Sequence, residues 1–350
     1  MEKKNEKTIE LKTMKHVVVN EDIRIFEVQP AKLFDVYLQM IEQELGLLLK
    51  KWDLFDINCP GCNSQKNEQL FKKFGMTYVE CQNCKTVFVT PRPSEFNITQ
   101  YYQKSKSMTF WLNKVYKATL SSRKRVIVHP RAFWIVDVTE TYLKKPVTLI
   151  DFRTKYNEFV QALRSFKFFD RITLVEPYRS IRDTVSSKNI HMYDSLDSVV
   201  SEGSRTAVFS ALEVIDRVSN PKEIIQKAHS LLEPNGLLFL TTTTISGFDL
   251  QILWQHSKSI HPLDHMNLFS TEGITKLLTD CGFEIIELST IGQLDLEIVR
   301  NAVNNDPSIQ VPRFVTYLLE NRDERAHRAF QDFLQQYNLS SPLRIVAQKK

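Results

Sequence analysis

Four of the five cysteines form two closely spaced pairs that could bind a metal ion. Cys59 and Cys62 are separated by two turn-forming residues, and so are Cys81 and Cys84. This spacing lets both thiolates of a pair reach one ion from a tight turn. It therefore predicts a tetrahedral zinc site with four sulfur ligands. Because such a site leaves no position for water, it is typical of a structural zinc rather than a catalytic one.

Other interpretations of the pairs stay open: a redox dithiol, an iron–sulfur site, or cysteines that carry no ligand. The odd cysteine, Cys281, precedes Gly282 at a predicted helix-to-strand junction. A buried structural thiol is the expected role of a free cysteine in this context.

Acidic residues are a second group that could do chemistry. Asp151 and Glu176 end the first two strands that we predict in the C-terminal half. In an open doubly wound sheet, ligands bind outside the carboxyl ends of the strands, and an acid after the second strand can accept hydrogen bonds from ribose hydroxyls. A surface carboxylate without a ligand is the other interpretation of Glu176.

The elements that must position these acids follow Pro146, where short apolar runs alternate with helix-length segments. This alternation predicts repeated β-α units and a parallel sheet. The predicted strands are 147–151, 171–176, 189–193, 206–211, 237–243, 283–288 and 343–347, with helices at 157–166, 221–232 and 271–281 and a turn at 234–236.

The N-terminal part has a different pattern. We predict an extended segment at 17–28, a helix at 31–50, a metal-organised ribbon rich in Cys, Pro, Gly and Asn at 57–93, and an aromatic-rich helical connector at 97–138. The predicted domains are an N-terminal strand and helix (1–56), a zinc ribbon (57–95), the connector (96–145) and a Rossmann-like domain (146–350) with a helical insertion at 307–338.

Composition favours a soluble globular protein. Hydrophobic residues make up 42% and charged residues 25% of the 350 residues, which is close to the globular average. The net charge of +5 is not gathered into a basic stripe, so a nucleic-acid-binding zinc protein is a distant alternative. Neither a signal peptide nor a membrane-spanning apolar run is recognisable, so we expect a cytoplasmic protein without membrane partners.

Several stretches together resemble class I S-adenosylmethionine-dependent methyltransferases that carry an N-terminal zinc-binding segment, a group that includes sugar C-methyltransferases and enzymes of surface-polysaccharide pathways. The matching stretches are Cys-Pro-Gly-Cys at 59–62, 75–84, Pro-Arg-Pro at 91–93, 130–132, 213–221, 231–236, 247–249 and His-Met-Asn-Leu-Phe-Ser at 265–270. The resemblance covers the chain from residue 57 onward.

The resemblance implies an α/β fold: a Rossmann-like seven-stranded methyltransferase sheet with an N-terminal zinc-ribbon segment and a helical connector. It also implies S-adenosylmethionine as cofactor, held by Asp151, Glu176, Asp194 and Glu213. The expected substrate is a sugar or another small polar metabolite, with nucleotide sugars included, and a protein partner is a further expectation.

Two positions depart from the family pattern. The loop after the first strand, residues 151–157, contains no glycine, although the family uses a glycine-rich loop there. Glycine allows positive φ and close approach of the backbone to a ligand, which a side chain penalises. In addition, Arg217 follows Asp216 where the family usually has a histidine, and arginine cannot exchange a proton near neutral pH.

Two hypotheses follow. In the first, the protein is an enzyme in which Glu176 holds the ribose and His265, in the loop after the fifth strand, is the base. A hydrogen-bonded structural histidine is the alternative for His265. In the second, the loss of the glycine loop has left a catalytically inactive methyltransferase-like protein that binds or scaffolds a partner.

Overall fold

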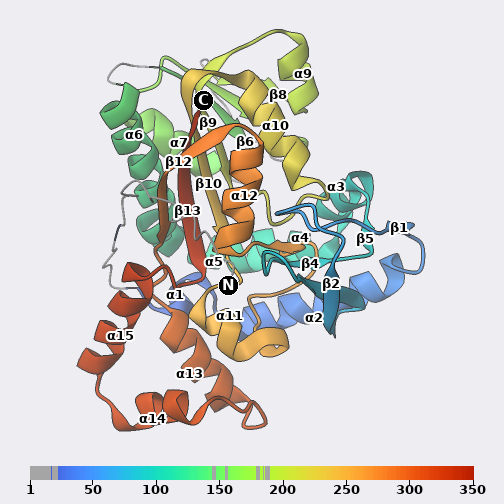
Figure 1. Ribbon diagram of the computed structural model, residues 1–350, viewed down its shortest axis with the longest axis vertical. Helices are drawn as coiled ribbons and strands as arrows, with labels where there is room; N and C mark the ends of the chain where they lie inside the picture. Colours follow the sequence, from blue (N-terminus) through green and yellow to red (C-terminus); the bar gives the residue numbers. More distant parts are fainter. Residues whose placement is uncertain are drawn as a thin grey trace, which may run out of the picture.

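The computed structural model describes residues 17, 23–143, 147–153, 157–178, 182–183, 185 and 190–350 (Figure 1). Its centre is a seven-stranded sheet in the order β12-β13-β10-β9-β6-β7-β8. Strand β13 runs antiparallel to both of its neighbours, and the pairs among β6 to β10 are parallel. The predicted Rossmann-like seven-stranded sheet is thus confirmed. The strands are β6 Thr148–Phe152, β7 Arg171–Val175, β8 Ile190–Tyr193, β9 Thr206–Leu212, β10 Leu232–Thr243, β12 Phe283–Thr290 and β13 Pro342–Lys349.

The central strands are apolar because helices cover both faces of the sheet. Every residue of β9 is buried, which is the pattern of a parallel strand with two covered faces. One core joins the sheet to α9, α10 and α12, and the other joins it to α6 and α7. The helices on the two faces are α6 His129–Leu143, α7 Asn157–Ser165, α9 Leu196–Ser201, α10 Pro221–Leu231 and α12 Thr271–Asp280.

The N-terminal region packs beside this sheet. Helix α2, Ala31–Leu48, buries one face against a four-stranded sheet in the order β11-β4-β3-β2. The strands are β2 Asn67–Lys73, β3 Met76–Cys81, β4 Val87–Val89 and β11 Asn267–Leu268, with a small β1 (Leu54–Phe55) and β5 (Arg92–Pro93) pair beside them. Because β11 comes from the C-terminal half of the sequence, the ribbon is hydrogen-bonded into the larger domain.

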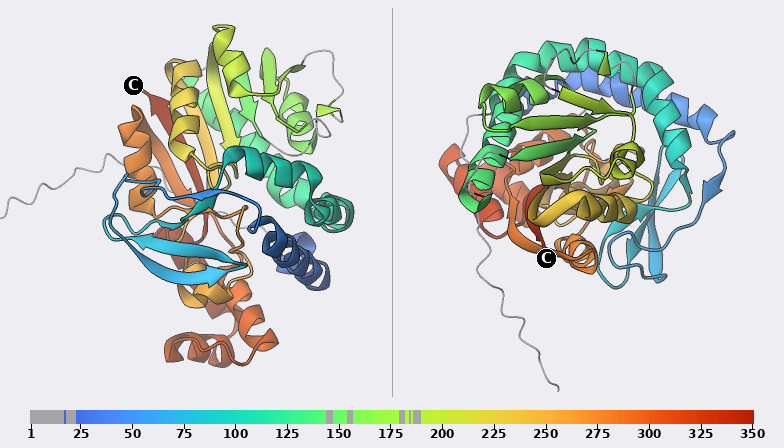
Figure 2. Two further views of the ribbon diagram at one scale, coloured as in Figure 1. Left: turned by 90° about the vertical axis from the view of Figure 1, so that its right-hand side faces the viewer. Right: turned by 90° about the horizontal axis from the view of Figure 1, so that it is seen from above.

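A helical connector, interrupted at the extended Ser105, leads from the ribbon to the sheet and curves around it (Figure 2). Its segments are α3 Glu95–Lys104, α4 Lys106–Phe110, η1 Trp111–Tyr116, α5 Lys117–Arg123, η2 Lys124–Val128 and then α6. After β10 come α11 Phe248–Leu253 and η3 Trp254–His256. Three helices, α13 Asp295–Asn305, α14 Arg313–Asn321 and α15 Glu324–Gln336, form a lobe between β12 and β13 that lies at the bottom of Figure 1. Among the described helices, none combines the length and hydropathy that a bilayer crossing requires.

Two predictions of local structure were wrong. The segment predicted as extended contains a short helix, α1 Ile25–Val28, because the Glu27 carboxylate accepts a hydrogen bond from the Arg24 amide at its start (2.9 Å); residues 18–22 lie outside the described part. The turn predicted at 234–236 lies within β10 as an irregularity in its pairing with β9, and Asn235 supplies a positive φ of 63° there.

Candidate metal centre and cofactor edge

The four cysteines predicted as metal ligands come together at one point. Their Sγ atoms all lie within 4.8 Å of one another, and the pairs Cys59–Cys84 and Cys62–Cys81 are each 3.5 Å apart. A tetrahedral ion with bonds of about 2.3 Å to sulfur places its ligands about 3.8 Å apart. The donor set and spacing therefore fit a zinc ion.

Both pairs use the same turn. The Cys59 carbonyl accepts a hydrogen bond from the Asn63 amide (2.8 Å), and the Cys81 carbonyl accepts one from Lys85 (3.0 Å). Asn63 and Lys85 have positive φ values of 60° and 62°. Each turn thus directs its two sulfurs to the same side, and the local sequence is sufficient to make it.

The cluster is packed directly against helix α12. Cys84 Sγ lies 3.3 Å from Thr86 Oγ1, which in turn contacts the Ser270 hydroxyl at the start of α12 (3.4 Å). A Cβ atom on Gly273 would lie 2.0 Å from Thr86 Oγ1 and 3.3 Å from Cys84 Sγ. Glycine is therefore needed at position 273 for this close approach.

A fully buried arginine fixes the ribbon to the sheet domain. Arg92 donates to the Val89 carbonyl (2.8 Å), to Asn267 Oδ1 (2.8 Å) and to the Met266 carbonyl (3.2 Å). The Asn267 amide donates onward to the carbonyls of Ile215 and Val218, both at 2.9 Å. The Pro-Arg-Pro and His-Met-Asn-Leu-Phe-Ser stretches of the sequence thus meet in space, where they connect the ribbon to the loop after β9.

The cofactor edge, which we define as the ends of β6, β7 and β9 with Phe152, Arg153, Tyr178, Glu213 and Arg217, is filled by side chains. Arg153 has a positive φ of 59°, a conformation that favours glycine. Its side chain is 11% exposed, forms an ion pair with Glu95 of α3 (2.7 Å) and lies over the rings of Phe152 and Tyr178. The remainder of the glycine-free loop, residues 154–156, lies outside the described residues.

The two acids predicted at the first strand ends are both fully buried. Asp151 accepts a hydrogen bond from the Ser210 hydroxyl (2.6 Å), and burial, opposed by that bond, raises the pKa of Asp151 to about 7. Glu176 accepts a hydrogen bond from the Tyr178 amide (2.9 Å). Both carboxyls thus form hydrogen bonds with neighbouring residues of the chain.

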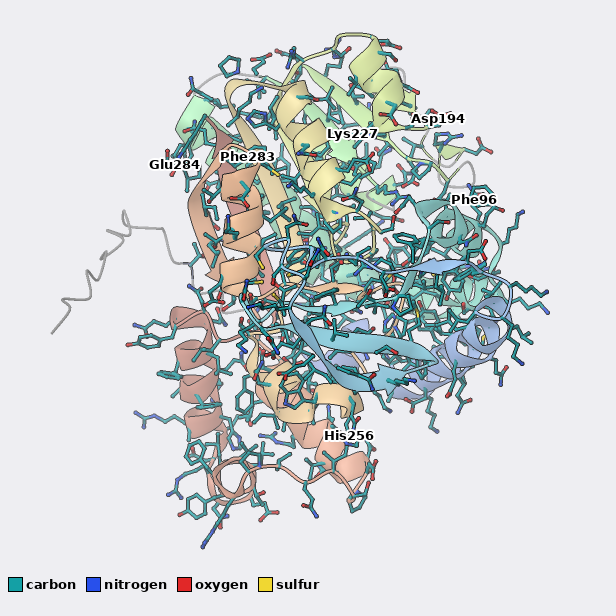
Figure 3. The ribbon with its side chains drawn as sticks, turned by 45° about the vertical axis from the view of Figure 1, so that its right-hand side comes forward. Phe96, Asp194, Lys227, His256, Phe283 and Glu284 are labelled. Atoms are coloured by element: carbon teal, nitrogen blue, oxygen red, sulfur yellow. The ribbon has the colours of Figure 1, made fainter. Side chains whose placement is uncertain are left out.

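The other two predicted cofactor residues differ in setting. Asp194 is exposed on the outer surface (Figure 3), where it accepts a hydrogen bond from the Ser198 hydroxyl (3.2 Å). Glu213, with a φ of 54°, pairs with Arg131 (2.5 Å) and Arg217 (3.2 Å). Burial alone would raise the pKa of Glu213, but the two arginines lower it to about 2. Glu213 is therefore ionised and paired at neutral pH.

Sequence analysis missed Asp264, which extends this ion-pair chain. Arg217 contacts Asp264 (3.2 Å), and Asp264 also accepts hydrogen bonds from the hydroxyls of Tyr37 and Tyr102. The only sequence signal was an acid flanked by two histidines at 261–265. Its contacts with Tyr37, Tyr102 and Arg217, which are far from it in the sequence, identify it in the structure.

His265, predicted as the base, directly follows Asp264 in the sequence. Its amide donates to the His261 carbonyl (3.0 Å), and the two imidazole rings are 5.0 Å apart. Burial and the neighbouring His261 lower the pKa of His265 to about 3, so its ring is neutral. His265 is not in the lining of the cavities described below, and its catalytic role stays a prediction.

Cavities large enough for a metabolite lie beside α13 and α15 (about 630 Å³) and beside the end of β8, where Asp194 is part of the lining (about 400 Å³). A third, which we call the large cavity, is the one that shares lining residues with the cofactor edge. It has a volume of about 340 Å³ and lies beyond the ends of β9 and β10. Its polar lining includes Arg131, Glu213, Thr242, Asp249, Asp295 and Arg344, and its apolar lining includes Ile23, Val126, Ile127, Trp134 and Ile298.

The cofactor edge holds much less space. Two cavities there, both lined in part by Arg153, Glu213 and Arg217, have volumes of about 60 and 10 Å³. Pockets for cofactor-sized ligands usually measure about 300–1,000 Å³. The side chains at the cofactor edge, as they are arranged in this structure, therefore leave no room for a nucleoside.

The central part of the sequence matches a known family. Residues 128–288 match the model of a methyltransferase domain, which spans the helix α6 and strands β6 to β10 and continues into β12. A search of curated proteins finds no match.

Solved structures with a similar arrangement are distant in sequence. The plantazolicin methyltransferase BamL, in complex with a triazolic desmethylPZN analog and SAH, is 11% identical, with 73% of this chain and 95% of that chain covered and a TM-score of 0.47. The [4+2]-cyclase SpnF is 13% identical (62% and 80% covered, TM-score 0.40). The N-methyltransferase NodS from Bradyrhizobium japonicum WM9 is 10% identical (65% and 96% covered, TM-score 0.37).

The cofactor of this family is S-adenosylmethionine, and the residues at the cofactor edge fit it only in part. Carboxylates are present at the ends of β6, β7 and β9, but Arg153 and Tyr178 occupy the space beside them. The fold and the family match nevertheless agree on the class of the domain. Over residues 128–288 the chain is therefore similar to a methyltransferase domain, and its central sheet has the Rossmann-like fold.

Proposed function

We propose that the protein transfers a methyl group from S-adenosylmethionine to a small polar metabolite bound in the large cavity. One observation carries this proposal: the large cavity opens at the ends of β9 and β10, two strands of the matched domain, and shares Arg131 and Glu213 with one of the small cavities at the cofactor edge. An acceptor in that cavity would be next to the cofactor position. A sugar acceptor, including a nucleotide sugar, and a role in surface-polysaccharide synthesis are finer predictions of the same proposal.

The chemistry of the lining narrows the acceptor. The wall combines the Arg131–Glu213 ion pair with apolar side chains such as Ile127 and Trp134. A ligand that carries polar groups on a partly apolar body matches such a wall. In this proposal Asp151, Glu176, Asp194 and Glu213 keep their predicted roles toward the cofactor, and His265 keeps its predicted role as base.

The test measures transfer and binding separately. Purified protein is incubated with radiolabelled S-adenosylmethionine and a panel of sugar phosphates, nucleotide sugars and amino metabolites, and cofactor binding is measured by calorimetry. Absence of both transfer and cofactor binding at millimolar concentration would exclude the enzyme.

A cavity-filling variant locates the acceptor. Thr243→Trp places an indole in the large cavity and should lower kcat/KM for the acceptor by about tenfold or more, while cofactor affinity stays unchanged. Thr275→Trp, on the exposed face of α12, is the matched control. Equal activity of the two variants would place the acceptor elsewhere.

A second candidate function is a catalytically inactive binding protein, which the filled cofactor edge favours. In that case the large cavity or the surface would bind a ligand or a protein partner without any methyl transfer. Lack of cofactor binding by the protein, together with binding of a metabolite from the same panel, would support this candidate over the first.

We also propose that the four cysteines hold a structural zinc ion. The proposal is supported by the sulfur spacing and by the absence of any open coordination position in a four-thiolate site. Elemental analysis of the purified protein should give one zinc per chain, and cobalt substitution should give the absorption of a tetrahedral thiolate site.

A further inference from the structure

Arg153 occupies the position where the backbone of this family approaches its cofactor. It directly follows β6, and its φ of 59° is one that glycine adopts without strain and that other residues rarely adopt. The Arg153 amide is held there by the Val175 carbonyl (2.9 Å). The backbone thus retains the conformation of a glycine loop at this position, although the side chain is large and charged.

The Arg153 side chain is held across the cofactor edge at several points. Its guanidinium pairs with Glu95 (2.7 Å), contacts Thr99 (3.4 Å) and lies 5.5 Å from the centre of the Phe152 ring and 5.8 Å from that of Tyr178. An ion pair together with aromatic faces is a favourable environment for a guanidinium. Arg153 is therefore a resident cation in a position where a cationic cofactor would otherwise lie.

Glu95, the partner of Arg153 in this ion pair, comes from helix α3 outside the sheet. It lies in the first turn of α3, and its second oxygen accepts hydrogen bonds from the amide (2.9 Å) and hydroxyl (3.1 Å) of Ser219 in the loop after β9. The same carboxylate thus joins α3, the loop after β6 and the loop after β9.

The contacts of the Arg153 side chain within the described part of the chain leave one of its hydrogen-bond donors unsatisfied. The Nε atom of Arg153 is buried and has no hydrogen-bond acceptor among the described residues. A buried donor without a partner makes the closed arrangement less favourable than a fully satisfied one. In addition, Arg153 lines both of the small cavities at the cofactor edge, so its withdrawal would enlarge the space there.

We propose that Arg153 is a plug that closes the cofactor position and that Glu95 is its tether, so that these two residues set the affinity for S-adenosylmethionine. This inference rests on the proposed function. Cofactor binding requires the Arg153–Glu95 ion pair to break and the guanidinium to leave the space between Phe152 and Tyr178.

The experiment is calorimetric titration of the full chain with S-adenosylmethionine and S-adenosylhomocysteine. Arg153→Gly removes the plug and keeps a residue suited to positive φ, and it should bind both ligands about tenfold or more tighter than the natural chain. Glu95→Gln keeps an acceptor for Ser219 but removes the charge, and it should tighten binding by a smaller factor. Lys167→Gly, at an exposed residue with a φ of 53°, controls for relief of backbone strain and should leave affinity unchanged.

The outcomes separate this inference from the proposed function. Equal, measurable affinity in the natural chain and in Arg153→Gly would overturn the plug and leave the enzyme standing. Tight binding by Arg153→Gly without methyl transfer in either protein would support the plug and overturn the enzyme. If neither protein binds at millimolar concentration while both unfold at the same temperature as the Lys167→Gly control, both proposals fail.

Discussion

Side chains converge both at the cysteine cluster and at the cofactor edge, but they leave room for a ligand only at the cluster. At the cluster, four sulfurs from two local turns lie within 4.8 Å of one another. At the cofactor edge, strand ends converge in the manner of the family, but Arg153 and Tyr178 fill the centre. A site encoded by short local turns can therefore be recognised from spacing alone. A cleft between distant elements depends also on what those elements insert into it.

The largest expected effect would come from breaking the cluster. Cys81→Ser removes one thiolate, and since metal binding contributes folding free energy to a small ribbon, we expect loss of zinc and a free energy of unfolding lower by about 3–5 kcal/mol. Cys281→Ser, at a buried thiol outside the cluster, is the control and should retain zinc. Thermal unfolding and elemental analysis measure both. Full stability of Cys81→Ser would show that no ion supports the ribbon.

The next effect tests whether the cluster is independent of its attachment to the sheet domain. Arg92→Met removes the guanidinium that donates to Asn267 Oδ1 and to the carbonyls of Val89, Met266 and Ser219, so we expect a loss of about 3 kcal/mol. Zinc content should not change, because the hydrogen bonds of the guanidinium go to Val89, Met266, Asn267 and Ser219 and not to a cysteine. Arg171→Met, at the exposed start of β7, should be near neutral. Loss of zinc in Arg92→Met would contradict the local character of the metal site.

A pH experiment probes the cofactor edge. The folded-state pKa of Asp151 is raised to about 7 by burial, whereas an unfolded aspartate titrates near 4. Between these values the folded state binds more protons, so the free energy of unfolding should fall with rising pH by up to about 1.4 kcal/mol per pH unit for this group. Asp151→Asn should remove that contribution.

Asp216, whose pKa burial also raises to about 7, should keep part of the slope in the Asp151→Asn variant. Exposed Asp197→Asn is the control. Urea unfolding at pH 5, 6, 7 and 8 measures the difference. An unchanged slope in Asp151→Asn would mean that this carboxyl is ionised in the folded state.

The smallest expected effect concerns the contact between the cluster and α12. Gly273→Ala places a methyl group against Thr86 Oγ1 and should cost about 1–2 kcal/mol. The added change Thr86→Ala removes that oxygen and should recover part of the loss. Gly46→Ala, where nothing lies within 4 Å of the new atom, should instead stabilise α2 by about 0.5–1 kcal/mol. No recovery in the double variant would argue against this contact.

The sequence was most informative where one segment determines its own structure. The apolar run at 206–211 was predicted as a strand and lies in β9, and the hydrogen bonds of the two cysteine turns are local. It was less informative where a distant residue decides. The absence of glycine predicted a crowded loop, but not that Glu95 of α3 would tether Arg153.

The same reason explains the remaining misses. Asp264 became visible as a hub only when α2, α3 and the loop after β9 were placed around it. The short helix at 25–28 begins with a hydrogen bond from the Arg24 amide to the Glu27 carboxylate, a local contact that periodicity over a longer window does not detect. Side-chain convergence across elements is a tertiary property, and single-sequence patterns carry little of it.

The placement of β11 has a consequence for shortened versions of the protein. Asn267–Leu268 pairs with β4. A chain that begins after residue 95 lacks β4, so it would expose the unpaired edge of β11 and the apolar side chains of the larger domain that the ribbon now covers. Such a fragment should self-associate, although it would contain the whole seven-stranded sheet. The smallest soluble unit must therefore begin upstream of the cysteines.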